Sequence, residues 1–90
     1  MAGRIQVHTI PVALACAAAN RHTVIIIALE KDGSSEEREA EPYSLKEKNG
    51  KWLFFCYDVR KRGTRSFYLD NILSVRETDH TFTPQFPIEF

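Results

Sequence analysis

The fold of this chain is organised around one stretch, Lys51-Trp52-Leu53-Phe54-Phe55-Cys56-Tyr57-Asp58. It is the densest aromatic run in the sequence, and it directly follows Asn49-Gly50. Two-residue β-hairpins favour Asn-Gly because both central positions need a positive φ, which these residues tolerate best. The pair therefore predicts a hairpin whose second strand covers residues 51–57.

Both faces of this predicted strand are apolar, because side chains alternate along a strand. One face carries Trp52, Phe54 and Cys56, and the other carries Leu53, Phe55 and Tyr57. A strand covered on one side only would alternate apolar with polar residues. We therefore expect a central strand covered on both sides, with most of its aromatic side chains, including Trp52, in the core of a small barrel or sandwich.

Length and composition fit one small domain, residues 1–90, with room for a single core. The chain is 43% hydrophobic and 11% aromatic, and its 12 Lys and Arg balance its 12 Asp and Glu. A neutral chain exerts no global pull on polyanions, so any such binding must come from a local patch. Cys16 and Cys56 lie in apolar stretches without paired spacing, so we expect buried free thiols and a reducing, cytoplasmic setting.

The N-terminal segment has more than one interpretation. Residues 4–10 alternate weakly and fit a short edge strand. Arg4 followed by the small apolar residues 11–19 also fits a signal peptide, but this run is short and poor in leucine, and His8 interrupts the approach to it. No stretch reaches the roughly 20 apolar residues that a membrane helix needs, so we expect no membrane partner.

The remaining pattern predicts one helix followed by five antiparallel strands. Pro11 suits the first turn of a helix over residues 12–20, which Asn20 can end. The strands are expected at residues 23–29, 36–48, 51–57, 65–69 and 72–78. Pro42 should bend the long second strand or place a bulge in it. The predicted fold is mainly β with one N-terminal helix: a Sm-like or SH3-like five-stranded small barrel. Its core would be about residues 11–78, with 79–90 as an extended tail that packs on the barrel or forms an interface.

Four segments, in order and with suitable spacing, resemble the WYL domain family. They are Arg38 to Leu45, Asn49 to Phe54, Tyr57-Asp58 and Arg65 to Ile72. Trp52 keeps the first letter of the Trp-Tyr-Leu run that names the family, and Leu53 and Phe54 replace the other two. The last segment matches Arg-x-Phe-x-Leu-Asp-Arg-Ile, except that Asn71 stands where the family usually has arginine. The resemblance covers about residues 11–78.

The resemblance implies a WYL-type Sm-like barrel that senses ligands rather than one that catalyses. WYL domains usually follow a winged or helix-turn-helix domain in bacterial transcription regulators. Some are attached to helicases, and others stand nearly alone as accessory proteins. The proposed ligands of the family are single-stranded DNA or RNA or nucleotides, held by basic and aromatic side chains. With one short helix we expect no helix-turn-helix here, so the chain is a stand-alone member or a domain of a longer regulator or helicase.

Candidate ligand contacts lie in a locally basic middle segment. Residues 38–76 hold nine Lys and Arg against five acids, about four positive charges in excess. The candidates for phosphate binding are Arg65, Arg38, Arg60, Lys61 and Arg62, and those for base stacking are Tyr57, Tyr68 and Tyr43. A guanidinium can donate two parallel hydrogen bonds to a phosphate, and aromatic rings stack on bases of any sequence.

Structural roles remain open for each candidate. Arg65 could instead pair with Asp58 or Asp70, and Arg38 with the acids that surround it in sequence, Glu36, Glu37 and Glu39. The cationic loop 60–62 could be a solvated hairpin tip, and each tyrosine could belong to the core or rim of the barrel.

Other functional classes find little support in the sequence. His8, His22 and His80 have no metal-ligand spacing, no nucleophile has a paired base, and no glycine-rich phosphate loop is present. We therefore expect no catalysis, metal or cofactor. The alternative function is a protein–protein interaction or dimerisation module without nucleic-acid binding, using strand edges and the tail residues Phe82, Phe86 and Phe90.

Overall fold

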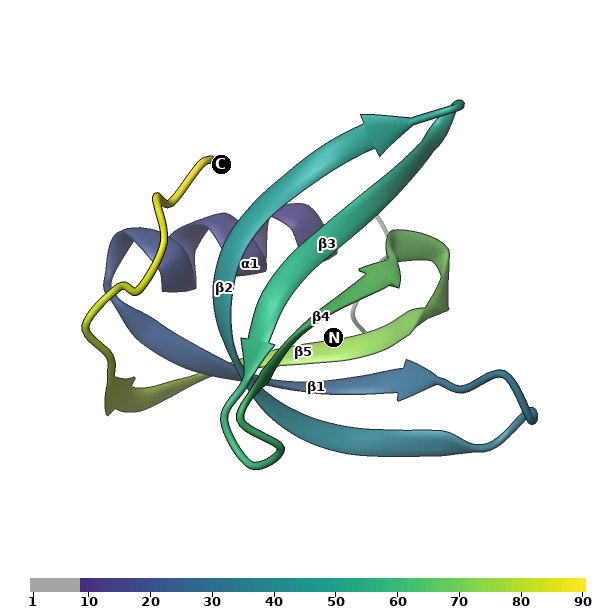
Figure 1. Cartoon of the computed structure of the whole chain (residues 1–90), viewed down its shortest axis with the longest axis horizontal. Coiled ribbons are helices and arrows are strands. Elements are labelled where there is room, and N and C mark those ends of the chain that lie inside the picture. Colours follow the sequence, from purple (N-terminus) through teal and green to yellow (C-terminus); the bar gives the residue numbers. More distant parts are fainter. Residues whose placement is uncertain (1–8) are drawn as a thin grey trace, which may run out of the picture.

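The computed structural model describes residues 9–90 and shows one helix followed by five strands (Figure 1). The elements are α1 (Ile10–Ala19), β1 (His22–Leu29), β2 (Ser35–Lys48), β3 (Lys51–Asp58), β4 (Gly63–Tyr68), the short 3-10 helix η2 (Leu69–Asn71) and β5 (Ile72–Thr81). This confirms the predicted mainly-β, five-stranded class with a single N-terminal helix. The edge strand considered for residues 4–10 lies outside the described residues up to position 8, and Ile10 already belongs to α1.

All five strands form one antiparallel sheet in the order β4-β3-β2-β1-β5. The long β2 is central and bends, so that its first half pairs with β1 and its second half with β3 (Figure 1). The register shifts between Pro42 and Ser44, which leaves Tyr43 as an extra residue without a partner across the strand pair. A bulge of this kind sharpens the local twist and bends the strand. The predicted irregularity at Pro42 is confirmed.

The hairpin between β2 and β3 is also confirmed. Asn49 has φ 54° and Gly50 has φ 81°, the two positive values that a tight hairpin turn of this kind requires.

The strand β3 is covered on one face only, so the expectation that it is buried on both is wrong. Phe54 and Cys56 are buried on the inner face, whereas Phe55, on the other face, is 39% exposed. Trp52 shares the inner side but is 46% exposed, because it lies near the hairpin tip, beyond the core. With a single helix the domain can cover one face of the sheet, so the apolar outer face of β3 stays partly open to solvent.

The helix α1 packs against β1, β2 and β5 and completes the core. Its buried side chains are Ile10, Leu14, Ala17 and Ala18. The expected burial of Cys56 is confirmed, whereas Cys16 is exposed, and that expectation is wrong. The helix sequence is apolar all round, so it contains no polar stripe to mark the solvent side.

The strand β5 does not alternate regularly between buried and exposed side chains. Ile72 and Val75, three residues apart, are both buried, whereas Leu73 is 52% exposed. The pairing of β5 with β1 shifts register between Ile27 and Ala28. The extra residue in β5 places Ile72 and Val75 on the same face although they are an odd number of residues apart.

The C-terminal tail, residues 82–90, folds back along β2. The rings of Phe82 and Phe86 meet the Tyr43 ring edge-on, at centroid distances of 5.8 and 5.2 Å. The Glu89 N–H donates to the Tyr43 carbonyl at 2.8 Å. The tail therefore packs as an extended segment on its own domain. Within residues 9–90, no helix has the length and apolar character needed to cross a bilayer.

Candidate nucleic-acid interface

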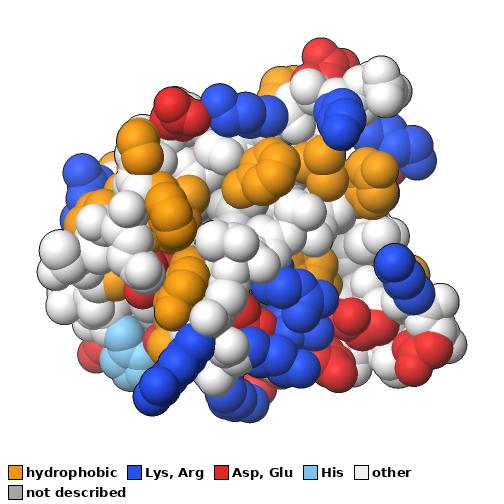
Figure 2. Space-filling model, in the orientation of Figure 1, with side chains coloured by type: hydrophobic (Ala, Val, Ile, Leu, Met, Phe, Trp, Pro, Cys, Tyr) orange, Lys and Arg blue, Asp and Glu red, His pale blue; other side chains and the backbone are white. Residues whose placement is uncertain are grey.

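Asp58 fixes the loop that joins β3 to β4. Its carboxylate accepts hydrogen bonds from the backbone N–H groups of Arg60 (3.1 Å) and Lys61 (3.0 Å), and its carbonyl oxygen accepts one from Arg62 (2.8 Å). The Arg62 backbone is left-handed, with φ 57°. The three cationic side chains of this loop, residues 60–62, are exposed, and none forms a salt bridge with another described residue. Figure 2 shows Lys and Arg side chains gathered over this end of the molecule.

Arg38 supports the same loop from inside the domain. Its side chain is 6% exposed, and its Nη1 donates to the Asp58 carboxylate at 2.7 Å. Its Nη2 also lies 2.9 Å from a Glu36 carboxylate oxygen and 3.4 Å from one of Glu30. The guanidinium lies 5.6 Å from the centre of the Phe67 ring. Arg38 is therefore held in an ion-pair network and does not lie on the open surface with the loop.

Asp58 and Arg38, which form the buried ion pair, both have shifted pKa values. Burial alone would raise the pKa of Asp58, but hydrogen bonds from the Lys61 N–H and from Arg38 outweigh it and hold that pKa below its usual value. Burial likewise disfavours the charged form of Arg38, yet the hydrogen bond to Asp58 and the charges of Glu30 and Glu36 raise its pKa. Both groups therefore stay charged at neutral pH.

The side chain of Arg65 begins on the inner face of the sheet, opposite the outer face that carries Phe55 and Tyr57. Arg65 pairs across the strands with Cys56, so its side chain starts on the core side of β4, and its guanidinium lies 5.4 Å from the Phe67 ring centre. Arg65 forms no salt bridge with a described residue, but it lines a hollow together with Lys31 and the three acids Glu30, Asp32 and Glu36. An anion that approached Arg65 from this hollow would meet those carboxylates.

The three candidate tyrosines are far from equivalent. Tyr57 is half-buried on β3, directly before Asp58 and the basic loop. Tyr68 is 46% exposed at the other end of β4, with the Lys51 ammonium 5.7 Å from its ring centre. Tyr43 is 5% exposed. Tyr57 alone among the three combines partial exposure with a position beside the basic loop.

Tyr43 binds the C-terminal tail through its ring and its hydroxyl. Its hydroxyl donates to Glu41 at 2.6 Å and accepts from the Gln85 N–H at 3.0 Å. Burial of the phenol and its hydrogen bond to Glu41 raise the pKa of Tyr43 to about 12, against the opposing effect of the Gln85 N–H, which favours the phenolate. Its ring is covered by the tail and therefore offers no open face for a base.

Comparison with known proteins identifies the family. The family model of the WYL domain matches residues 12–77, most of the chain. This chain belongs to the WYL domain family. The predicted resemblance is therefore confirmed, and the family indicates a regulatory or ligand-sensing module.

A solved structure with the same fold is Proteasome accessory factor B/C (PafBC) of Arthrobacter aurescens, with a TM-score of 0.78 and 20% sequence identity. The match covers 96% of this chain but 15% of PafBC, so the present WYL domain spans a small part of that protein's length. At this identity the match shows the shared fold. No curated protein matches the sequence.

Asn71 distinguishes this WYL domain from the usual family pattern. It lies in a small hollow with Arg65, Phe67 and Tyr68, beside Glu30. An arginine at this position would have added another cation beside Arg65 and Lys31. In this WYL domain the cations on that side lie among the carboxylates of Glu30, Asp32 and Glu36, whereas the loop 60–62 carries three exposed cations.

One side chain of the outer face of this WYL domain, Phe55, was not among the predicted contacts. Phe55 was expected in the core but is exposed beside Thr64 and Ser66 of β4. Together with Tyr57 it forms an aromatic row that leads away from the basic loop. The structure distinguishes the two faces: Phe54, Cys56 and Asp58 share the inner face, where Asp58 meets Arg38.

Proposed function

We propose that this WYL domain binds single-stranded nucleic acid, or a nucleotide-like ligand, through the β3–β4 loop and the outer face of β3 and β4. The observation that carries the proposal is the loop 60–62. Three exposed cations, none of them in a salt bridge with a described residue, are held at the end of a partly exposed aromatic row, and the buried Asp58 fixes the backbone that presents them. Of the three, Arg60 lies near enough to the carboxylate of Glu39 to lower the pKa of that acid.

In the proposed mechanism the loop binds the phosphates of the ligand and the sheet binds its bases. Arg60, Lys61 and Arg62 contact phosphates, and the rings of Tyr57 and Phe55 stack on bases. Such a surface binds through charge and ring faces, so it discriminates little between sequences. Arg38 is a positioning residue that acts through Asp58, and Arg65 is an additional cation at the side. The proposed role is binding for regulation or as an accessory module, without catalysis.

The test is fluorescence anisotropy with labelled single-stranded DNA and RNA over a salt series. Each phosphate contact on a single strand contributes about −0.7 to the slope of log K against log salt. We expect the variant Arg60→Ala/Lys61→Ala/Arg62→Ala to reduce that slope by about 2.

A matched control removes the same charge from elsewhere. Lys48→Ala/Lys51→Ala/Arg76→Ala deletes three exposed cations outside the loop and should change the slope little. Arg65→Ala in the same series shows whether the flanking arginine contributes. Wild-type binding that does not respond to salt would contradict the proposal, because phosphate contacts must weaken as salt rises.

The alternative function is a protein–protein interaction or dimerisation module. The specific observation in its favour is that β4 and β5 are the two edge strands of the sheet and have no second strand partner within residues 9–90. Exposed edges can pair with another chain by strand addition. A concentration-dependent mass in analytical ultracentrifugation, with no binding to either polymer at low salt, would favour this alternative.

A further inference from the structure

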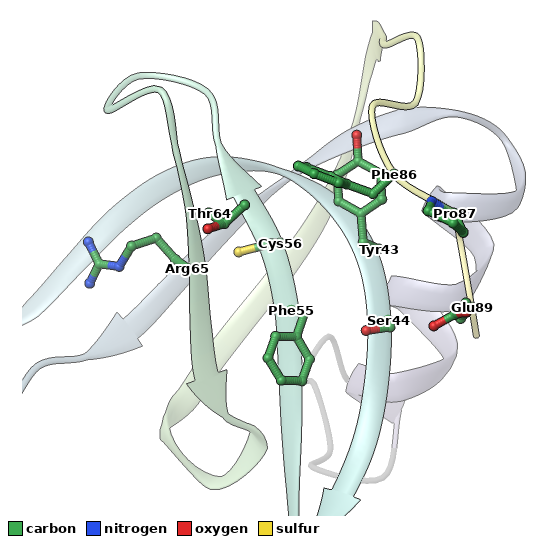
Figure 3. A pocket seen from close by; sticks show the side chains of 9 residues that line it. All are labelled: Tyr43, Ser44, Phe55, Cys56, Thr64, Arg65, Phe86, Pro87 and Glu89. Carbon is green, nitrogen blue, oxygen red and sulfur yellow. The ribbon is translucent and has the colours of Figure 1, made fainter.

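A hollow of about 270 Å³ lies between the C-terminal tail and the outer face of β2, β3 and β4 (Figure 3). We call it the tail pocket. The side chains that define it are Tyr43, Ser44, Phe55, Thr64, Phe86 and Glu89. We propose that the tail pocket is a nucleobase subsite, which takes one base of a bound single strand or the base of a nucleotide. The inference rests on the proposed function and adds to it the C-terminal tail as part of the site.

The walls of the tail pocket offer aromatic faces. Phe55 is 39% exposed on β3 and Phe86 is 44% exposed on the tail. Figure 3 shows Phe86 beside Tyr43 and Phe55 farther along β3. Every base has a π-face, so an exposed ring binds bases without regard to sequence. Two partly exposed phenylalanines lining one hollow therefore suit a flat aromatic ligand.

The polar groups of the pocket suit a neutral, hydrogen-bonding ligand better than a phosphate. The hydroxyls of Ser44 and Thr64 can each donate and accept, as the edges of bases require. Arg65 also contributes to the lining, but Figure 3 shows its guanidinium pointing away from the tail. The carboxylate of Glu89 is paired with Lys46 at 2.8 Å, so its charge is compensated.

The tail pocket lies within reach of the basic loop. Thr64 follows Arg62 by two residues, so the two lie at most about 7 Å apart along the chain. A base in the pocket would therefore leave its phosphate close to Arg62 and its neighbours. The subsite and the phosphate contacts form one continuous surface, which matches a strand or a nucleotide whose base and phosphate are a few ångströms apart.

The pocket wall formed by the tail is anchored before any ligand binds. The Phe86 ring meets Tyr43 at an interplanar angle of 83°. The Gln85 N–H donates to the Tyr43 hydroxyl, and the Glu89 N–H donates to the Tyr43 carbonyl. A wall held by three contacts to the bulge residue Tyr43 lowers the ordering cost of binding.

The test compares two labelled probes, a thymidine oligonucleotide of about 12 nucleotides, within the range of single-strand site sizes, and an abasic strand of equal length. For the thymidine strand we expect Phe86→Ala and Phe55→Ala each to weaken binding about 5-fold or more, the effect of losing one stacked base. Neither substitution should alter binding of the abasic strand. The matched control is Phe90→Ala, because Phe90 is on the same tail and 45% exposed but does not line the pocket.

Two further variants separate stacking from packing and from misfolding. Phe86→Tyr keeps a ring and should retain wild-type affinity, whereas Phe86→Leu keeps apolar volume without a ring and should behave like Phe86→Ala. Full affinity in Phe86→Leu would overturn the base subsite. Loss of the folded circular dichroism spectrum in Phe86→Ala would leave Phe86→Leu as the deciding variant, because Phe55 also stacks on bases in the proposed function.

The outcomes also separate this inference from the proposed function. Equal, salt-sensitive binding of both strands by the wild type would overturn the subsite and leave phosphate binding by the loop intact. Absence of binding to either strand at low salt would overturn both.

Discussion

Replacement of Asp58 by asparagine tests whether a buried ion pair holds the basic loop. The side chains of Asp58 and Arg38 are 3% and 6% exposed, and they meet at 2.7 Å. Removal of one partner of a buried pair costs about 3–5 kcal/mol, because the other charge is left without compensation. Arg38 would keep Glu36 at 2.9 Å and Glu30 at 3.4 Å. We therefore expect a loss near the lower limit, about 3 kcal/mol.

The loss should be large on the scale of this domain. Domains of this size lose about 4–8 °C in Tm per kcal/mol, so Asp58→Asn should lower Tm by roughly 12–24 °C. Urea and thermal unfolding followed by circular dichroism measure it. Asp70→Asn, at an exposed carboxylate, is the control and should change stability by less than about 0.5 kcal/mol. A loss below about 1 kcal/mol in Asp58→Asn would refute the assigned role of the pair.

The same variant makes a prediction about pH. The pKa of Asp58 is lowered from 3.8 in the folded domain, so its contribution to the free energy of unfolding is present above that value. The contribution is lost as pH falls through the folded pKa. Acid unfolding of Asp58→Asn should therefore show a shallower dependence on pH below about 4 than the wild type.

Three further predictions concern other parts of the domain. Leu14→Ala empties a fully buried site under α1 and should cost about 2–5 kcal/mol in urea unfolding, and a smaller loss would contradict the packing of the helix on the core. Asn49→Val places a β-branched residue at φ 54° and should cost about 1–2 kcal/mol, whereas Asn49→Gly should be nearly neutral because glycine tolerates a positive φ. Hydrogen bonding to Glu39 raises the pKa of His80 above 6.5, so their mutual stabilisation should be present below 6.5 and disappear as pH rises through the folded pKa. His80→Gln should abolish that part of the pH dependence in Tm, and an unchanged profile would exclude the pair as its source.

The turn chemistry and the family motifs of this chain were readable from the sequence. Asn49-Gly50 fixed one hairpin, because few residue pairs tolerate two positive φ values. The bulge is reflected in the spacing of Arg38, Pro42 and Leu45, whose side chains all begin on the inner face of β2. Arg38 and Pro42 are four residues apart, an even step, whereas Pro42 and Leu45 are three residues apart, an odd step. Because side chains alternate between the two faces of a strand, two residues an odd number apart can share a face only if a bulge adds one residue between them.

Which individual side chains are buried could not be predicted as well from the sequence. An apolar strand shows the same pattern whether one face or both are covered, and only the number of covering elements decides between them. That is why Phe55 was assigned to the core and the half-exposed Trp52 with it. The position of the tail depended on Tyr43 leaving the regular register, a long-range effect that local sequence patterns do not report.

Among the predicted contacts, the loop 60–62 was identifiable because its charges are consecutive. Of the acids named for Arg38, Glu36 does pair with it, at 2.9 Å. The buried partner Asp58 was not identifiable, because it is 20 residues away in sequence and lies beside Arg38 only after β2 has paired with β3. The acids nearest in sequence, Glu37 and Glu39, are on the opposite side of the strand from Arg38, as strand alternation requires.

The contrast between the two thiols has a practical consequence for spectroscopy. Burial raises the pKa of the Cys56 thiol to about 12, whereas Cys16 is exposed on α1. A maleimide dye should therefore attach at Cys16 in the unmodified protein, on a helix away from the basic loop. By the same chemistry, air oxidation would join two chains through Cys16 and imitate a dimer, so mass measurements should be made in the presence of a reductant.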